Sequence, residues 1–233
     1  MDGHTPVLEF RDARLAIEPG GGLTVPVTLS VAQGALVTAD LRGPRRRQAF
    51  AEAAAGLNAP ASGTIQFQGR DWQEVPPEHA AAMRGRIGRH FARGAWLPEL
   101  TIEENILLAP LYHTARSVGG LREEAARLAI AFGLPGLPTG APGGLPVADL
   151  HRAGLVRAFL NAPALVVLEE PTAIDGPDLL PALMEAVRAV RDRGGAVLWL
   201  TESIAVALDR TVPATARYRL VHGALIPLGR IAA

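Results

Sequence analysis

Residues 35–57 are the segment that most constrains the fold, because they combine a buried strand, a short turn and a helix. The apolar run Ala35–Thr38 is typical of an interior strand of a parallel sheet. Gly43 and Pro44 interrupt it, and the strong helix formers of Ala49–Leu57 predict a helix. A turn between a buried strand and a helix is a common phosphate-binding site, so this turn is the first candidate site.

The turn lacks the side chains of a P-loop. The pattern G-x-x-x-x-G-K-[ST] places glycine amides around phosphate oxygens, a lysine charge beside them and a hydroxyl on Mg²⁺. Arg46, Arg47 and Gln48, followed by Ala49, stand where the pattern has its second glycine, its lysine and its Ser/Thr, and the chain contains no lysine. Pro44 has no amide hydrogen, so we do not expect an amide nest around phosphate.

The cluster Arg45, Arg46 and Arg47 permits two interpretations. The arginines could bind phosphate oxygens, since a guanidinium forms bidentate contacts with phosphate. They could instead be a solvated charged cap at the start of a helix, although three cations there oppose the helix dipole.

Composition excludes several classes of function. The 233 residues include 23 basic and 23 acidic side chains, so neither a nucleic-acid surface nor a polybasic membrane patch is expected. The absence of cysteine rules out disulfides and Cys-based zinc sites or nucleophiles. With neither a signal peptide nor a run of about 20 apolar residues, the chain is expected to be cytoplasmic or peripheral to a membrane.

The spacing of apolar residues and the positions of glycine and proline predict the remaining helices and strands. Residues 7–17 and 23–31 alternate in polarity around the turn 19–22, which indicates an antiparallel hairpin. Thr101 and Glu104 have the spacing of a capping box. The connectors 117–120 and 135–146 are expected to be mobile loops. Further strands are expected at 64–69, 86–91, 164–168, 196–200, 218–221 and 224–228, and helices from 77 on and at 101–109, 121–132, 150–160, 179–193 and 204–210.

The order of the elements predicts a single α/β domain, 1–233. Its core is expected to comprise residues 1–91 and 162–233, with a helical subdomain, 92–161, inserted between them.

This order resembles the ATP-binding cassette, the nucleotide-binding subunit of ABC transporters, over nearly the whole chain. The resemblance implies a P-loop NTPase-like, RecA-type core with a mixed sheet, an N-terminal antiparallel hairpin and an inserted helical subdomain. Short sequences that are typical of the family occur at non-catalytic positions. They are Ala55-Gly56-Leu57, Ser62-Gly63-Thr64-Ile65, Gly69-Arg70-Asp71, Leu97-Pro98-Glu99-Leu100-Thr101, Glu104-Asn105-Ile106, Arg157-Ala158 and Glu169-Glu170-Pro171-Thr172.

The same resemblance implies that the nucleotide site is degenerate. Ile17 stands at the A-loop aromatic that stacks on adenine, and Ala92 at the Q-loop glutamine that contacts Mg²⁺. Glu202 replaces the switch histidine, which puts an anion where γ-phosphate would be contacted. The degenerate P-loop comprises Gly43, Pro44, Arg45, Arg46, Arg47, Gln48 and Ala49, and the degenerate L-S-G-G-Q signature comprises Leu145, Pro146, Val147, Ala148 and Asp149.

Glu170 has the position of the family's general base, and Glu169 that of its Mg²⁺-linked Asp. The pair could bind a cation weakly, but it is better interpreted as an inert, hydrogen-bonded remnant. We expect no catalytic residue and neither ATP nor Mg²⁺ as cofactor. His113 has no second His or Cys at metal spacing, so no metal site is expected either.

The segment 93–111 resembles the family's docking surface for a transmembrane permease. This segment is more similar to the family's sequence than the residues of the nucleotide site are. Arg93, Trp96, Leu97 and Glu104 are therefore predicted to contact a permease. Residues 105–114 also resemble the bacterial lipid-transport branch that works with MCE proteins.

The predicted function is therefore a pseudo-ATPase subunit at the cytoplasmic face of the inner membrane. It would dock on a permease and pair with an active cassette as a heterodimer, or with a second copy of itself. One alternative is an unusual but active ATPase that uses the arginine cluster and Glu170. Another is a soluble binding module without a permease.

Overall fold

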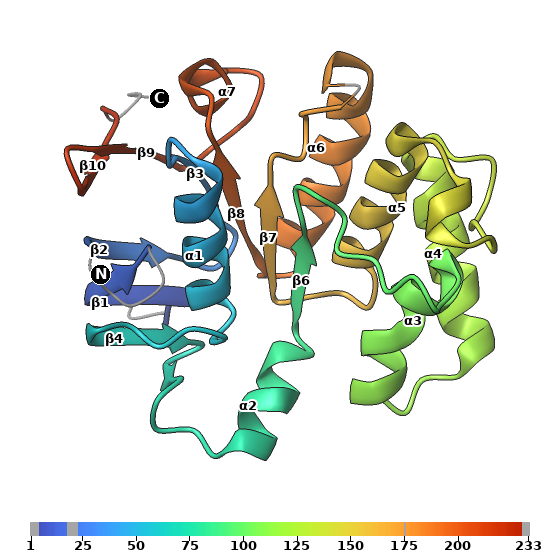
Figure 1. Ribbon diagram of the computed structural model, residues 1–233, viewed down its shortest axis with the longest axis horizontal. Helices are drawn as coiled ribbons and strands as arrows, with labels where there is room; N and C mark the ends of the chain where they lie inside the picture. Colours follow the sequence, from blue (N-terminus) through green and yellow to red (C-terminus); the bar gives the residue numbers. More distant parts are fainter. Residues whose placement is uncertain (1–4, 18–22, 175, 230–233) are drawn as a thin grey trace.

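The structure is a computed structural model that describes residues 5–17, 23–174 and 176–229. It contains two sheets with helices on both sides of the larger one (Figure 1). The strands are β1 (Leu8–Ala16), β2 (Thr24–Val31), β3 (Leu36–Asp40), β4 (Ser62–Phe67), β5 (Arg70–Asp71), β6 (Ile87–His90), β7 (Leu165–Glu169), β8 (Ala196–Thr201), β9 (Ala216–Val221) and β10 (Ala224–Pro227).

The smaller sheet has the order β2-β1-β4-β5 and is antiparallel throughout. β1 and β2 form the predicted hairpin, and its predicted turn at 19–22 lies outside the described residues. The pairing of β1 shifts between Phe10 and Ala13, where Asp12 takes a positive φ of 48°. A bulge of this kind bends the strand and increases its local twist, and the pairing of β1 with β4 shifts at the same place, between Arg11 and Arg14.

The larger sheet has the order β10-β9-β3-β8-β7-β6 and is mixed. β9, β3, β8, β7 and β6 are parallel to their neighbours, and β10 pairs antiparallel with β9. β3, β7 and β8 are buried along their whole length, which explains why their sequences are mostly apolar and have polar residues chiefly at their carboxyl ends. The predicted α/β class with a mixed sheet is thus confirmed.

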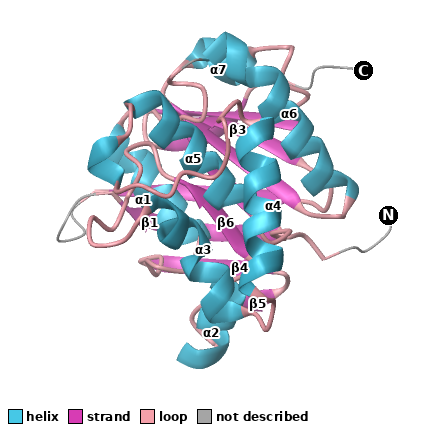
Figure 2. Ribbon diagram, turned by 90° about the vertical axis from the view of Figure 1, so that its right-hand side faces the viewer, coloured by secondary structure: helices cyan, strands magenta, loops and turns pink. Residues whose placement is uncertain are grey.

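The helices divide the hydrophobic core into two layers. α1 packs with both sheets on one face, while α5 and α6 pack on the other face of the larger sheet and α3 and α4 pack on α5; Figure 2, turned by 90°, views the molecule from the side of α3 and α4. The helices are α1 (Pro44–Ala54), α2 (Pro77–Arg84), α3 (Ile102–His113), α4 (Val118–Ala131), the 3₁₀ helix η1 (Pro142–Gly144), α5 (Val147–Phe159), α6 (Gly176–Asp192) and α7 (Ile204–Leu208).

α1 begins earlier than the sequence predicted. Arg45–Arg47 were expected in the turn, but they lie in the first turn of α1, which starts at Pro44. A proline fits the first helical position, because the amide hydrogen that it lacks would have no helical partner there. The positive φ angles occur before it, at Arg42 (48°) and Gly43 (136°).

The prediction of a mobile loop at 117–120 is also wrong. Ser117 caps α4, since its hydroxyl accepts a hydrogen bond from the amide of Gly120 at 3.1 Å. The capping box of α3 is confirmed in both directions: Thr101 accepts from the amide of Glu104, and the Glu104 carboxylate accepts from that of Thr101. No helix of the described chain is long and apolar enough to cross a membrane.

The division into a core and a helical subdomain stays a prediction. Residues 92–161 hold α3, α4, η1 and α5, and the three α-helices pack on one another. α5, however, also packs on β6 and β7 of the larger sheet, so the helices share a core with it.

The contact of α5 with β6 includes a buried pair of histidines. The rings of His90 on β6 and His151 on α5 meet edge to face, with centroids 4.6 Å apart. His90 Nδ1 lies 3.2 Å from the Glu169 carbonyl oxygen, and His151 Nε2 lies 2.9 Å from that of Pro171. Burial, with a smaller contribution from His151, lowers the pKa of His90 to about 3. His90 is therefore neutral in the folded protein at pH 7.

We expect His90 to make the folded state sensitive to acid. A histidine with a depressed pKa stabilises the fold above its unfolded pKa of about 6.5 and loses this contribution as the pH falls toward 3. Between pH 7 and pH 5 the free energy of unfolding should fall by about 2 kcal/mol more in the native chain than in His90→Leu. Urea titrations at both pH values measure the difference, and equal pH dependence of the two proteins would contradict it.

Gly88 is expected to be essential for the approach of α5 to β6. A Cβ there would lie 1.8 Å from the carbonyl oxygen of Ala158, which is backbone and cannot move aside. Gly88→Ala should therefore lower the free energy of unfolding by about 3 kcal/mol. The matched control is Gly143→Ala, where no atom lies within 4 Å of the added carbon and a change below about 0.5 kcal/mol is expected. Similar denaturant midpoints for the two variants would refute the packing argument.

Candidate functional site

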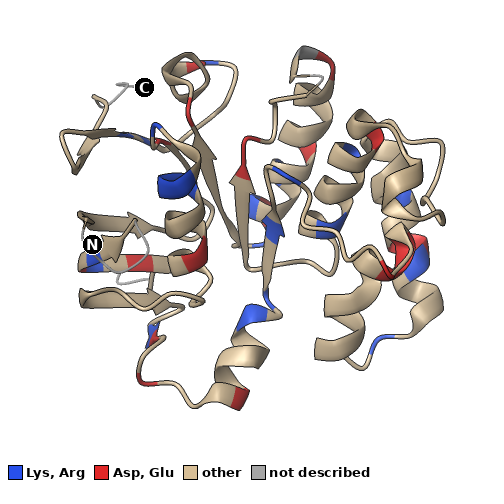
Figure 3. Ribbon diagram, viewed as in Figure 1, with Lys and Arg blue, Asp and Glu red and all other residues tan. Residues whose placement is uncertain are grey.

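The candidate site lies at the carboxyl ends of the parallel strands, where open α/β sheets commonly bind ligands. β7 ends at Glu169, with Glu170 next in the chain, and Glu202 follows β8. Figure 3 shows these acidic positions in red at the strand ends, facing basic positions in blue on α1 and β6. Parallel topology thus gathers three carboxylates that are up to 33 residues apart in sequence.

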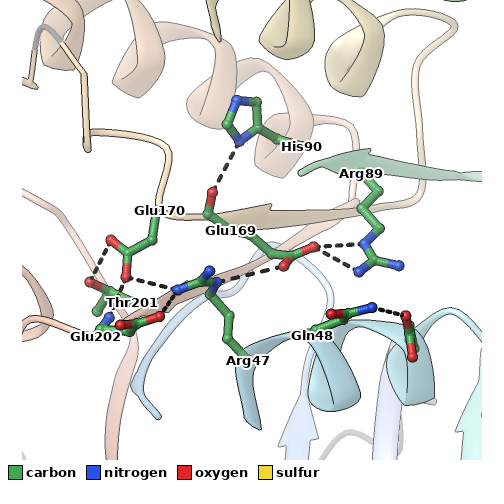
Figure 4. A network of polar contacts seen from close by, with 9 residues as sticks. Arg47, Gln48, Arg89, His90, Glu169, Glu170, Thr201 and Glu202 are labelled. Carbon is green, nitrogen blue, oxygen red and sulfur yellow. Dashed lines mark hydrogen bonds and ion pairs between the residues drawn. The ribbon is translucent and has the colours of Figure 1, made fainter. Parts of the chain in front are cut away.

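Arg47 lies in the middle of these carboxylates (Figure 4). It comes from the first turn of α1 and is only 7% exposed. Its Nε lies 3.6 Å from Glu169 Oε2, and its Nη1 lies 3.6 Å from Glu170 Oε1. Nη1 also donates a hydrogen bond to Glu202 Oε1. One guanidinium at the lysine position of the P-loop pattern is therefore shared among three carboxylates.

Arg89 supplies the second cation from the neighbouring strand β6. Its Nε donates to Glu169 Oε1 at 2.8 Å, and its Nη2 lies 2.8 Å from the same oxygen. Glu169 is 4% exposed and is held between Arg89 and Arg47. A buried carboxylate is tolerable only with such compensation, so Glu169 depends on both arginines.

Glu170 is held by the last residue of β8 and the first residue after it. Its carboxylate accepts hydrogen bonds from Thr201 Oγ1 at 3.1 Å and from the amide of Glu202. Burial nevertheless raises the pKa of Glu170, with a smaller contribution from the charge of Glu202, and the hydrogen bonds and Arg47 act in the opposite direction. Its φ of 48° is unusual for a residue with a Cβ, and the hydrogen bonds to Thr201 and Glu202 fix this conformation.

The other arginines of the cluster lie apart from the carboxylates. Arg45 is exposed, and Arg46 Nη1 donates to the carbonyl oxygen of Arg42 at 3.4 Å. Gln48 donates to Glu52 at 2.8 Å, along the exposed side of α1. The interpretation as a solvated cap is therefore wrong for Arg47, because the acids at the strand ends draw this side chain into the interior.

A cavity of about 520 Å³ lies beside Arg47, and its walls carry both charge signs. Ala92, at the predicted Q-loop position, and Arg93 belong to its wall. The complete lining is Pro44, Arg45, Arg47, Gln48, Glu52, Arg89, Phe91, Ala92, Arg93, Ala95 and Glu169.

The donor set does not fit a nucleotide with Mg²⁺, the group that the resemblance implies here. The guanidinium of Arg47 is engaged with carboxylates. Pro44 has no amide hydrogen, and the amide of Arg47 donates within the helix to Gly43 O at 3.1 Å. Gln48 has no hydroxyl and bonds to Glu52. We therefore derive no chemical step through a nucleotide, and the absence of a nucleotide cofactor stays a prediction.

Two other predicted positions lie outside this network. Ile17 follows β1, is partly buried and packs against the hydrophobic core that α1 shares with both sheets. The residues at the signature position begin α5: Pro146 caps the helix without a side-chain hydrogen bond, and Val147 is 70% exposed. An amide nest at this helix start would have no hydroxyl to assist it. The degenerate nature of both positions stays a prediction.

An apolar groove of about 490 Å³ lies next to the cavity, between the loop after β6 and α3. Of the four predicted docking residues, Leu97 lines the groove. Arg93 faces the other cavity, Trp96 packs partly against the core, and Glu104 is bonded to Thr101. The lining comprises Phe91, Ala95, Leu97, Asn105, Leu108, Ala109, Tyr112, His113 and Arg157.

The sequence interpretation missed three residues that hold the two sites together. Arg89 pairs with Glu169, Phe91 lines both the cavity and the groove, and Arg157 lies at the base of the groove. A signal existed for Arg89, because a charged residue within a predicted core strand needs a buried partner. Another existed for the exposed face of α3, where Leu108, Leu111 and Tyr112 leave apolar surface without cover.

Comparisons with known proteins agree with this fold. The profile of the ABC transporter family matches residues 49–173. The lipoprotein-releasing system ATP-binding protein LolD of Novosphingobium aromaticivorans is 30% identical over 218 residues, which cover 89% of this chain and 95% of that protein. The macrolide export ATP-binding/permease protein MacB of Syntrophobacter fumaroxidans is 30% identical over 155 residues, covering 65% of this chain and 22% of that protein.

A solved structure, the dimeric bacterial ABC transporter cassette MJ0796, has the same fold. It superposes with a TM-score of 0.80 at 17% identity and covers 94% of this chain and 96% of its own. The family match includes most of α1 and extends to the residues after β7, and the LolD alignment covers most of the chain. The chain therefore belongs to the ABC transporter family, as an ATP-binding cassette.

Proposed function

We propose that this cassette is a catalytically inactive subunit that docks on a membrane permease and pairs with an active cassette. The observation that carries the proposal is the position of Arg47. It stands where the P-loop pattern has its lysine and is paired with Glu169, Glu170 and Glu202. In a phosphoryl-transfer site these positions face phosphate, metal and water, whereas here they form ion pairs with one another.

The state of Glu170 supports the loss of general-base catalysis. A general base must reach the proton of the attacking water with a free oxygen. Both oxygens of Glu170 are engaged, Oε2 by Thr201 and Oε1 by the amide of Glu202 and the charge of Arg47. Glu202 at the switch position adds a carboxylate where a γ-phosphate would be repelled.

The residues at the signature position favour a regulatory or scaffolding role for this chain within the dimer. In the family, this region closes over the nucleotide of the opposite subunit. Pro146, exposed Val147 and Asp149 offer neither a hydroxyl nor glycine amides there. Any hydrolysis in the complex would then come from the partner cassette, without normal closure by this chain.

The apolar groove supports docking. Its walls carry exposed Leu97, Leu108 and Tyr112, which are 47%, 49% and 79% exposed. Exposed apolar surface of this kind marks protein contacts. We infer that the groove faces a permease at the cytoplasmic side of the inner membrane. Because the relatives include a lipoprotein-releasing protein, we propose a lipid or lipoprotein as the transported class.

Nucleotide binding tests the inactive state. Calorimetric titration of the purified chain with ATP and Mg²⁺ should give a dissociation constant weaker than about 0.1 mM, which is about −5.5 kcal/mol. Tighter binding that is lost in the double variant Arg45→Ala/Arg46→Ala, with turnover that is lost in Glu170→Gln, would establish the alternative of an unusual active ATPase. In that alternative Arg47→Ala would abolish binding, whereas in our proposal it changes nothing that the titration measures.

Copurification tests the assembly. The tagged chain, isolated from its own cells in mild detergent, should bring down a transmembrane permease and a second cassette that has a complete P-loop. Recovery of the permease with two copies of this chain would replace the heterodimer by a homodimer. Recovery of the chain alone would support a soluble binding module and would eliminate the docking proposal.

A further inference from the structure

Arg157 gives the apolar groove a charged base. It is on α5 and is the one arginine among the residues that line the groove. Its Nη1 donates to the carbonyl oxygen of Ala95 at 2.9 Å, and its Nη2 donates to that of Gly94. Arg157 therefore fastens the loop after β6 to α5 through the backbone of this loop.

Aromatic rings enclose the same guanidinium. Its Cζ lies 4.3 Å from the ring centroid of Trp96 and 5.1 Å from that of Phe91. Arg89 Cζ also lies over Phe91, at 4.3 Å. The two arginines differ in their charge balance, because Arg89 is neutralised by Glu169.

Arg157 has no such counter-ion. Within the described chain no carboxylate pairs with it, and none lines the groove. The two acids at the start of α3 are engaged elsewhere, Glu103 with Arg122 and Glu104 with Thr101. Burial, and secondly the charge of Arg89, lower the pKa of Arg157 to about 10, a value at which it is still protonated at pH 7. The groove thus combines apolar walls with a positive charge that no carboxylate balances.

A charge in this setting favours one kind of occupant. Filling the groove with a purely apolar segment would exclude water from Arg157 without replacing its hydration. A carboxylate placed beside it would instead form a charge-assisted pair in surroundings of low dielectric constant. The walls accommodate a bulky apolar side chain, as in the binding of an amphipathic helix by a groove.

We propose that the groove binds a segment of the permease that inserts a bulky apolar side chain between Leu108 and Tyr112 and places an aspartate or glutamate against Arg157. This inference rests on the proposed docking function and names the chemistry of the partner. The carboxylate fixes the orientation of the bound segment, and the apolar anchor supplies most of the buried area.

The chain offers a clean means of finding this segment, because it has no cysteine. Ala109 lines the groove and is exposed, so Ala109→Cys accepts a photoreactive thiol label. Ala189→Cys, at an alanine on α6 that is also exposed, is the matched control. Irradiation in the cell's own membranes should link the label at position 109, and not that at 189, to one permease segment that contains Asp or Glu.

A synthetic peptide with the captured sequence then measures the pair. We expect the native chain to bind the carboxylate peptide about tenfold more tightly than its Gln or Asn analogue. Arg157→Gln should abolish this preference, and Arg157→Lys should keep part of it. Thermal unfolding shows whether each variant is folded; if Arg157→Gln is not, the two peptides on the native chain and on Arg157→Lys still decide.

The outcomes separate the two proposals. A captured segment without an acid, or equal affinity of the two peptides for the native chain, would overturn the role of Arg157 and leave docking intact. Capture of a second copy of this chain at position 109 would refute both the partner and its chemistry. No capture at 109, together with recovery of the chain alone in copurification, would refute the docking function itself.

Discussion

Charge repulsion at the ends of β7 and β8 is the constraint on which the site depends. Two consecutive glutamates at the end of one strand and a third after its neighbour would destabilise the folded state unless cations lie among them. Arg47 and Arg89 enter from α1 and β6, on opposite sides of Glu169. The strand ends, the start of α1 and the edge of the sheet are thereby joined by ion pairs between side chains of the protein.

The same contacts explain how α1 tolerates three arginines in its first turn. Cations at a helix start oppose its dipole, whereas acids there stabilise it. Helical side chains lean toward the amino terminus, so Arg47 reaches back to the strand ends and draws the carboxylates near the start of the helix. The anions that relieve the dipole are those of the protein itself, a resolution that neither interpretation of the arginine cluster contained.

Sequence patterns predicted the features of the fold that depend on residues close together in the sequence. The buried runs of β3, β7 and β8 and the capping box at Thr101 lie within a few residues of predicted places, because strand burial and helix capping depend on near neighbours. The predicted start of α1 is wrong because the prediction takes Pro44 as a helix breaker, although proline is favourable at the first helical position. The pairing of Arg47 with Glu202 spans 155 residues and depends on strand order, which no local pattern contains.

The loop after β6 connects the two sites. Phe91 and Ala95 line both the polar cavity and the apolar groove. Arg89 holds one face of Phe91 while it is paired with Glu169, and Arg157 approaches the same ring from α5. Contacts with Arg89 and Arg157 hold this loop in place, so that the groove is preorganised. Binding of a partner would then cost little conformational entropy for ordering the loop.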